Sequence, residues 1–365
     1  MTDSRPVSGS PGVLDTSRPW AFTTSELTAS LRRHTQDPNL TISEVTPKDF
    51  PNRRPSIGRI RGLHVLAHGT RGDYHFDLVV KEPQGSTRTG TAGGGLREIS
   101  IYKILGDQMP VPIPEMVASH PGGGWLVMRR LIEDRPPETW RASDYLLAID
   151  QLSILHDRFW GLGEDLASYP WISRPFDADY SIHVRAAESS IRRLSLISPP
   201  TLLSKDPSLL SLLERILVHI DAIRAALMQD PFTLLHGDYW PGNINIYKDD
   251  ILTIFDWEHA AIGPAAIDLV SFIYKSRWWF NDLPVSPDEL VSRYRERISV
   301  SHDYAWEDAD WEASYDHALL WIFIADWVDL LASIPDSVLK ERSRQLEKIW
   351  LDPVRQAADR RLPKD

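Results

Sequence analysis

Residues 235–243 read Leu-His-Gly-Asp-Tyr-Trp-Pro-Gly-Asn, and residues 252–258 read Leu-Thr-Ile-Phe-Asp-Trp-Glu. In both stretches an apolar run leads into a polar cluster, which predicts short strands that deliver carboxylates to loops at the edge of a cleft. Asp238, Asn243 and Asp256 are the oxygen-bearing side chains of these loops. Magnesium prefers such oxygen ligands and usually takes only one or two carboxylates from a protein. The two stretches therefore predict a site for Mg²⁺ and a phosphate group.

Transfer of a phosphoryl group needs few reacting protein groups, because the protein mainly orients the acceptor and neutralises the phosphates. Asp238 can orient or deprotonate an acceptor hydroxyl, while Asn243 and Asp256 can hold Mg²⁺. The pattern H-x-D-x-x-x-x-N, followed by an aspartate after a short hairpin, has the spacing of a kinase catalytic loop and its metal-binding segment. A single aspartate here is more often a turn or cap residue, so the prediction depends on both motifs together.

These motifs resemble those of the aminoglycoside phosphotransferase and choline kinase family of small-molecule kinases. Residues 236–243 match the family's HGD-x-x-x-x-N loop, and residues 256–270 resemble its segment DWE-x-A-x-x-G-x-x-x-x-DLA. The resemblance covers about residues 40–330. It implies an α+β, protein-kinase-like fold, in which a small N-lobe with an antiparallel sheet and a larger, mainly helical C-lobe enclose the active site.

The resemblance also implies roles for single residues. Asp238 would be the catalytic aspartate, and His236 would support its loop and orientation. Asn243 and Asp256 would be the Mg²⁺ ligands, with ATP or GTP as the co-substrate. Asp268 would be a structural aspartate that hydrogen-bonds the loop.

The N-terminal part offers a second set of candidates. Lys81 ends an apolar strand, and Glu98 follows on a helix predicted over residues 96–105. Such a lysine can contact the α- and β-phosphates while a helical glutamate holds its ammonium in place. The alternative is a surface lysine and a solvated glutamate.

Residues 125–131 stand where the resembled family has its interlobe hinge. Backbone groups around Met128 and Arg130 are therefore expected to hydrogen-bond adenine. Ser56 is the nearest candidate, with two glycines after it, for a hairpin that covers the nucleotide. The glycines of residues 85–95 form no Walker motif, because no Gly-Lys-Ser/Thr follows them, and they predict a flexible connection.

Two alternatives to a small-molecule kinase stay open. A protein kinase is disfavoured because G-x-G-x-x-G is missing before Lys81 and Ala-Pro-Glu is missing after Asp256. A nucleotide-binding pseudokinase or regulatory protein is disfavoured because all three residues of the catalytic motifs are present. Slow Mg²⁺-dependent hydrolysis of ATP would separate a kinase from a pseudokinase.

The hydrophobic pattern divides the chain into three parts. Residues 1–19 are rich in Ser, Pro and Gly and predict a flexible tail. Residues 20–130 contain mostly strand patterns, together with the helix of Glu98, and predict the N-lobe. Residues 131–365 repeat apolar residues at helical spacing and predict the C-lobe, with strands around residues 233–235, 244–247 and 252–255.

The composition narrows the class of partner. The 365 residues carry a net charge of −11, contain no cysteine and show no long Lys/Arg run, which disfavours nucleic acid. The apolar stretch 318–334 is interrupted by Asp326 and Asp329, so a buried helix is expected there and no membrane partner. Because no signal peptide is recognisable at the N-terminus, we expect a cytoplasmic protein, either monomer or homodimer.

The acceptor is only broadly constrained. Trp240, Trp278 and Trp279 are candidates for contacting it, because tryptophan faces hold amines or stack on rings. Glu258 is a further candidate, and its alternatives are a carboxylate near or on a second metal ion and a residue that only stabilises its loop. Core packing is the alternative for each tryptophan except Trp240, which lies inside the catalytic loop. Aminoglycosides, amino alcohols, other antibiotics, sugars and nucleosides stay open, and the acidic balance slightly favours an amine-bearing or ring-containing alcohol.

Overall fold

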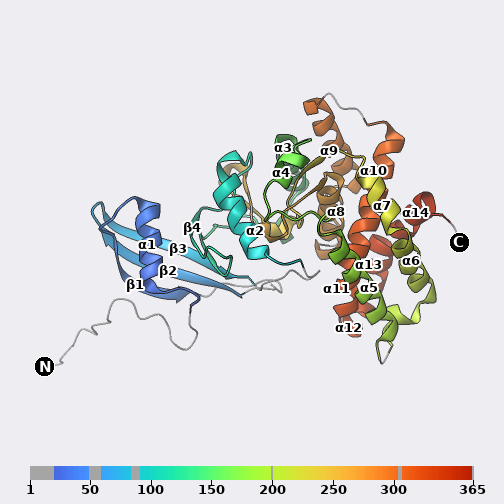
Figure 1. Cartoon of the computed structure of the whole chain (residues 1–365), viewed down its shortest axis with the longest axis horizontal. Helices are drawn as coiled ribbons and strands as arrows, with labels where there is room; N and C mark the ends of the chain where they lie inside the picture. Colours follow the sequence, from blue (N-terminus) through green and yellow to red (C-terminus); the bar gives the residue numbers. More distant parts are fainter. Residues whose placement is uncertain are drawn as a thin grey trace.

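Two lobes lie side by side along the long axis of the computed structural model (Figure 1). The structure describes residues 20–48, 59–83, 91–198, 200–280, 282–302 and 306–363. Ser56 and the predicted flexible tail lie outside the described residues.

The N-lobe contains a five-stranded antiparallel sheet in the order β1-β2-β3-β5-β4. Its strands are β1 (Thr41–Lys48), β2 (Arg59–Gly69), β3 (Gly72–Glu82), β4 (Met116–Ser119) and β5 (Leu126–Arg129). Helix α1 (Thr24–Thr35) begins with a capping box, in which Thr23 and Glu26 satisfy each other's backbone N–H groups. Lys81 occupies the central strand, where it pairs with Ile60 on one side and Leu126 on the other.

Helix α2 (Gly94–Ser100) continues into a π-helical turn, η1 (Ile101–Leu105). This confirms the predicted helix and adds a change of pitch. Gly95 is required because a Cβ there would lie 2.2 Å from the carbonyl oxygen of Gly123. The buried apolar residues of α2 and η1, which are Ile99, Ile101, Tyr102 and Leu105, belong to the core of the larger lobe, so the helix that carries Glu98 joins the two lobes.

The C-lobe is mainly helical. Its helices are α3 (Ala142–Arg158), α4 (Gly163–Ala167), α5 (Tyr180–Leu196), α6 (Pro207–Val218), α7 (Ile220–Leu227), α8 (Ala266–Phe280), α9 (Pro287–His302), α10 (Asp308–Ile322), α11 (Val328–Ser333), α12 (Asp336–Glu341), α13 (Ser343–Leu346) and α14 (Asp352–Arg361). A π-helical turn, η8 (Phe323–Trp327), connects α10 to α11, and another, η9 (Glu347–Leu351), leads into α14. Helix α8 is buried along nearly its whole length, which explains its continuous apolar sequence.

Two small antiparallel pairs interrupt the helices of the C-lobe. β6 (Phe232–Leu235) pairs with β9 (Ala261–Pro264), and β7 (Ile244–Tyr247) pairs with β8 (Ile251–Ile254). The β7–β8 hairpin confirms the predicted one, and both residues of its turn that have positive φ are aspartates. The loops after β6 and β8 carry the two sequence motifs and contact each other, since His236 bonds the carbonyl of Phe255.

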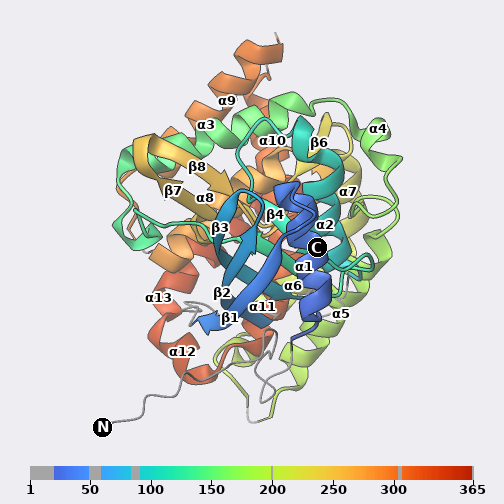
Figure 2. The ribbon, with the colours of Figure 1, turned by 90° about the vertical axis from the view of Figure 1, so that its left-hand side faces the viewer.

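The fold is the protein-kinase-like α+β fold that the resemblance implies. Seen from its N-lobe end, the sheet lies in front of the helices of the C-lobe (Figure 2). No helix of the described part of the chain is long and apolar enough to cross a membrane.

Candidate active site

A cavity of about 1380 Å³ is lined by residues of both lobes. The predicted site residues that line it are Lys81, Glu98, Met128, Arg130, Asp238, Trp240, Asn243, Asp256, Glu258 and Trp279. His236 is buried directly behind Asp238, to whose backbone it is bonded. Trp278 is almost fully buried and packs on Trp327, so the structure places it in the core rather than among the cavity-lining residues.

The catalytic loop leaves β6 through a turn that only glycine tolerates. Gly237 has φ +79°, and a Cβ there would lie 2.1 Å from the carbonyl oxygen of His259. The buried carboxylate of Asp268, at the start of α8, accepts the backbone N–H of His236 at 2.6 Å and that of Gly237 at 2.9 Å. His156 also bonds this carboxylate, at 3.3 Å. Asp268 thus holds the loop as the resemblance implies.

His236 fixes the next part of the loop. Burial lowers the pKa of His236, so its ring is neutral. Nε2 lies 2.9 Å from the carbonyl oxygen of Phe255 and donates to it, because a carbonyl can only accept. Nδ1 then accepts the backbone N–H of Asp238 at 3.2 Å. One imidazole therefore joins the loop of Asp238 to the segment that precedes Asp256.

The carboxylate of Asp238 is held from both sides. Asn243 donates its side-chain amide to Oδ2 at 2.8 Å and to the Asp238 carbonyl at 2.9 Å. On the other side, the Lys275 ammonium lies 2.5 Å from Oδ1. Burial alone would raise the pKa of Asp238, but the Lys275 ammonium outweighs it and holds the pKa well below its usual range.

Lys275 was not among the candidates of the sequence analysis. It lies on α8, and its ammonium also contacts Asp326 of η8 at 3.2 Å. Burial alone would lower the pKa of Lys275, and the Asp238 carboxylate outweighs it, so the pKa is raised and the lysine is charged. A signal was present in the sequence, because a lysine inside an apolar helical stretch is costly unless it is paired.

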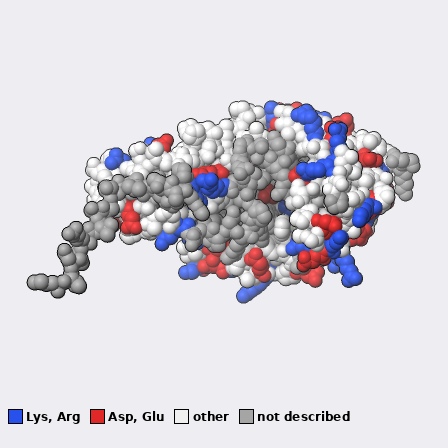
Figure 3. All heavy atoms as spheres, turned by 90° about the horizontal axis from the view of Figure 1, so that it is seen from below, with Lys and Arg blue, Asp and Glu red and all other residues white. Residues whose placement is uncertain are grey.

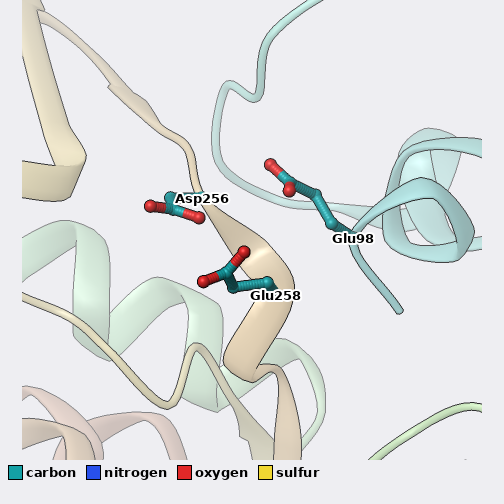
Figure 4. Close-up of side chains that lie close together, drawn as sticks. All are labelled: Glu98, Asp256 and Glu258. Carbon is teal, nitrogen blue, oxygen red and sulfur yellow. The ribbon is translucent and has the colours of Figure 1, made fainter. Parts of the chain in front are cut away.

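A second ion-pair cluster lies on the N-lobe side of the cavity. The carboxylates of Glu98, Asp256 and Glu258 point toward one another from α2 and from the segment after β8 (Figure 4). The Lys81 ammonium lies among them, 2.7 Å from Glu98, 3.0 Å from Glu258 and in direct contact with Asp256. The geometry brings together the predicted Lys81–Glu98 pair and adds two partners from the C-lobe.

These contacts decide which groups can bind a cation. Burial alone would lower the pKa of Lys81, but its three carboxylate partners raise it well above the ordinary value. Three carboxylates against one ammonium leave the cluster with excess negative charge. Asp256 is the most exposed of the three carboxylates. Asn243 uses its amide nitrogen for Asp238, which leaves its oxygen as the ligand atom, so both predicted ligands suit Mg²⁺.

The hinge lies between β5 and α3. Met128 belongs to β5, and the backbone N–H of Arg130 is donated to the Asp77 carbonyl at 2.9 Å. The carbonyl of Ile132 accepts from Asn245 at 3.1 Å. Leu131 lies between these two bonds, lines the cavity and has no backbone partner among the residues that the structure describes. An adenine contact at Leu131 therefore fits the geometry better than one at the Arg130 N–H.

The remaining acceptor candidates separate into two positions. Glu258 contacts Lys81 and therefore lies on the N-lobe side of the cavity. Trp240 and Trp279 pair at a centroid distance of 6.0 Å, and both line the cavity beside Asp238 and Lys275. Sequence reasoning missed α5 and η8, whose side chains His183, Asp326 and Trp327 also line the cavity.

Comparisons with solved structures agree with this fold. An ethanolamine kinase from Plasmodium vivax is similar, with a TM-score of 0.55 and 12% identity, over 86% of this chain and 83% of that chain. The GDP complex of a mutant aminoglycoside 2'-phosphotransferase-IIIa is also similar, with a TM-score of 0.51 and 15% identity, over 92% of this chain and 98% of that one. At such identities the likeness shows the fold alone.

A comparison with curated proteins gave no significant match. The sequence profile of the phosphotransferase enzyme family (APH) matches residues 64–331, which is more than half of the chain and includes both motifs. The chain therefore belongs to this phosphotransferase enzyme family.

Proposed function

We propose that this protein transfers the γ-phosphate of ATP to a hydroxyl group of a small molecule in an Mg²⁺-dependent reaction. One observation carries the proposal: Lys81, Asp238, Asn243 and Asp256 come from separate loops and strands and all line one cavity. The cavity exceeds the roughly 300–1,000 Å³ of a typical small-molecule pocket, which leaves room for a nucleotide beside an acceptor.

The nucleotide would lie between the hinge and Lys81. Leu131 offers backbone groups to adenine, and the Lys81 ammonium faces the phosphates from the central strand β3. Glu98 orients that ammonium, because its buried carboxylate lies 2.7 Å away. Asp256 and the oxygen of Asn243 would hold Mg²⁺, which neutralises phosphate charge when it is bound.

The acceptor would lie on the side of Asp238 that is opposite to the nucleotide. Its hydroxyl donates a hydrogen bond to the Asp238 carboxylate and attacks the γ-phosphorus in line. A bond forms between the acceptor oxygen and phosphorus, the bond to the β–γ bridging oxygen breaks, and ADP leaves. The hydroxyl proton passes to Asp238 late in the step and then to solvent.

Two variants test this assignment. We expect Asp238→Asn to lose nearly all turnover while it still binds ATP, because the amide keeps the shape of the carboxylate but cannot accept the proton. We expect Asp256→Ala to weaken binding of the Mg²⁺–nucleotide complex in calorimetry. Full phosphotransfer by Asp238→Asn would refute the role of Asp238, and unchanged affinity in Asp256→Ala would remove Asp256 from the metal site.

The surface charge and the proposed site together indicate the partners. On the face in Figure 3, Lys/Arg and Asp/Glu side chains of the larger lobe are interspersed, unlike the basic stripe that nucleic acids require. A nucleotide and a small hydroxylated molecule are therefore the partners we propose. A screen of hydroxylated metabolites and antibiotics for nucleotide consumption, with ATP and GTP in parallel, would identify both.

A further inference from the structure

The part of the cavity beside Asp238 differs in character from the nucleotide side. We call it the acceptor wall and define it by the cavity-lining residues of α5, α8, η8 and their neighbours. Its apolar members are Phe176, Trp240, Trp279, Trp321, Ile322 and Leu330. Trp321 packs on Phe176 at 4.8 Å between ring centroids and on His183 at 5.9 Å, so this surface is aromatic and preformed.

Helix α8 contributes a stripe with four-residue spacing, which places its side chains on one face. Ser271, Lys275 and Trp279 of this stripe all line the cavity. Lys275 contacts Asp238 at 2.5 Å, so Ser271 and Trp279 lie one helical turn before and one turn after the lysine that meets the proposed catalytic aspartate. Whatever accepts the phosphate must therefore lie against this face.

The carboxylate of the wall is already paired. Asp326 lies 3.2 Å from the Lys275 ammonium, which in turn contacts Asp238. A cationic acceptor would have to share Asp326 with a built-in ammonium and would meet like-charge repulsion from Lys275. Burial lowers the pKa of His183, so this histidine adds no charge to the wall at neutral pH.

The wall also contains buried polar atoms without partners in the described part of the chain. They are Ser271 Oγ, Trp327 Nε1 and both ring nitrogens of His183. Ser271 is 3% exposed and Trp327 is 1% exposed, so bulk solvent does not reach them. Buried polar groups are normally hydrogen-bonded, and an indole N–H can only donate. The Trp327 indole N–H therefore needs an acceptor atom from a ligand, and Ser271 and the neutral His183 can each donate to a second one.

The backbone supports the same position. Trp327 and Asp326 belong to η8, a π-helical turn inserted between α10 and α11. π-Helical turns are rare and occur frequently at functional sites, because they re-aim side chains of an otherwise regular helix. Here the turn presents both residues to the cavity.

We propose that the acceptor wall selects a neutral, ring-bearing alcohol with additional oxygen acceptors, and that the Lys275–Asp326 pair excludes polycationic acceptors. The inference rests on the proposed function, because it places the acceptor beside Asp238. The acidic net charge slightly favours an amine-bearing or ring-containing alcohol, and this inference keeps only the neutral, ring-containing one.

The test compares two probes that differ in charge. 1,4-Benzenedimethanol is neutral, and 4-(aminomethyl)benzyl alcohol replaces one hydroxyl by an ammonium. Their affinities are measured by tryptophan fluorescence with the wild-type full chain and Mg²⁺–ADP present. We expect the neutral probe to bind about 5-fold more tightly, which corresponds to one unopposed hydrogen bond. Equal or tighter binding of the amine, or no binding of either probe, would overturn the proposal.

Matched variants locate the effect in the wall. Ser271→Ala and Trp327→Phe should each weaken binding of the neutral probe about 3- to 10-fold, the range for one lost hydrogen bond. Ser276→Ala and Trp350→Phe are the controls, because both residues are buried and have an unpartnered polar atom but do not line the cavity. Equal effects in the two sets would contradict the assignment.

Two further variants test the charge pair. Lys275→Met should reduce or reverse the preference for the neutral probe, because Asp326 then lacks its ammonium. Since that variant removes the ammonium partner of two carboxylates and can fail to fold, Asp326→Asn provides the second arm. Asp326→Asn should still bind the neutral probe more tightly than the amine. If the wild-type protein instead prefers the amine and Asp326→Asn no longer binds it, Asp326 receives the acceptor's ammonium and the proposal is wrong. Binding of Mg²⁺–ATP by the same samples separates failure of this inference from failure of the proposed function.

Discussion

Asp268→Asn is the substitution whose effect the structure defines most closely. The carboxylate is fully buried, and its two oxygens accept different backbone N–H groups, from His236 on Oδ2 and from Gly237 on Oδ1. An asparagine has only one acceptor oxygen. One of the two N–H groups must therefore face an amide NH₂ group, and the other keeps a neutral bond in place of a charged one.

The cost can be estimated from these contacts. Hydrogen bonds to a charged group contribute about 1.5–3 kcal/mol, and a buried donor left without a partner costs about 1–3 kcal/mol. Removal of a buried charge offsets part of this loss. We expect Asp268→Asn to lower the free energy of unfolding by about 2–4 kcal/mol and to reduce turnover, because the loop that carries Asp238 begins at these two N–H groups.

Urea unfolding followed by tryptophan fluorescence measures the stability, and Mg²⁺-dependent ATP hydrolysis measures the activity. Asp249→Asn is the matched control, because Asp249 is an exposed turn residue with φ +57°, a conformation that asparagine also adopts readily. A loss below about 0.5 kcal/mol in Asp268→Asn, within the range of ordinary surface substitutions, would refute the proposed anchoring of the loop.

Three further predictions address other parts of the fold. Gly237→Ala should abolish activity and lower the melting temperature, because its φ is positive and its Cβ would collide with backbone; a wild-type melting curve would contradict this. Glu98→Gln should weaken ATP binding in calorimetry, because Lys81 loses its buried charged partner, and unchanged affinity would show that the two C-lobe carboxylates suffice. Thr23→Ala should lower the free energy of unfolding by about 0.5–2 kcal/mol through loss of the capping box with Glu26, and turnover should stay unchanged.

The parts that could be predicted from the sequence are those set by local patterns. The hairpin of residues 244–254 and the helix that carries Glu98 follow from periodicity, and the structure contains both. The spacing of the two motifs matches that of a kinase catalytic loop and its metal-binding segment, so the sequence alone predicts that Asp238, Asn243 and Asp256 lie close together. The Lys81–Glu98 pair could be predicted because Lys81 ends an apolar strand, Glu98 follows on a predicted helix and both precede the two motifs.

The acceptor side could not be predicted in the same way, because its residues are distant in the sequence. Lys275 and Asp326 are 51 positions apart by their numbering, and only the packing of α8 against η8 brings them together. Their spacing follows no motif, and the π-helical turn has no clear sequence signal. Trp278 and Trp279 show the same limit, since adjacent tryptophans point to the core and to the cavity respectively, and helical phase decides which.

The two buried lysines divide the cavity electrostatically. Lys81 faces three carboxylates, so that cluster keeps an excess negative charge when all four groups are ionised. A buried charge excess is costly unless a cation compensates it, which supports the proposed Mg²⁺ site on this side of the cavity. Among the described residues, Lys275 forms ion pairs with Asp238 and Asp326, and Asp238 is needed for the proposed acceptor hydroxyl. The described part of the acceptor wall therefore offers no unpaired carboxylate to a substrate ammonium, so on our proposal shape and neutral hydrogen bonds must supply its specificity.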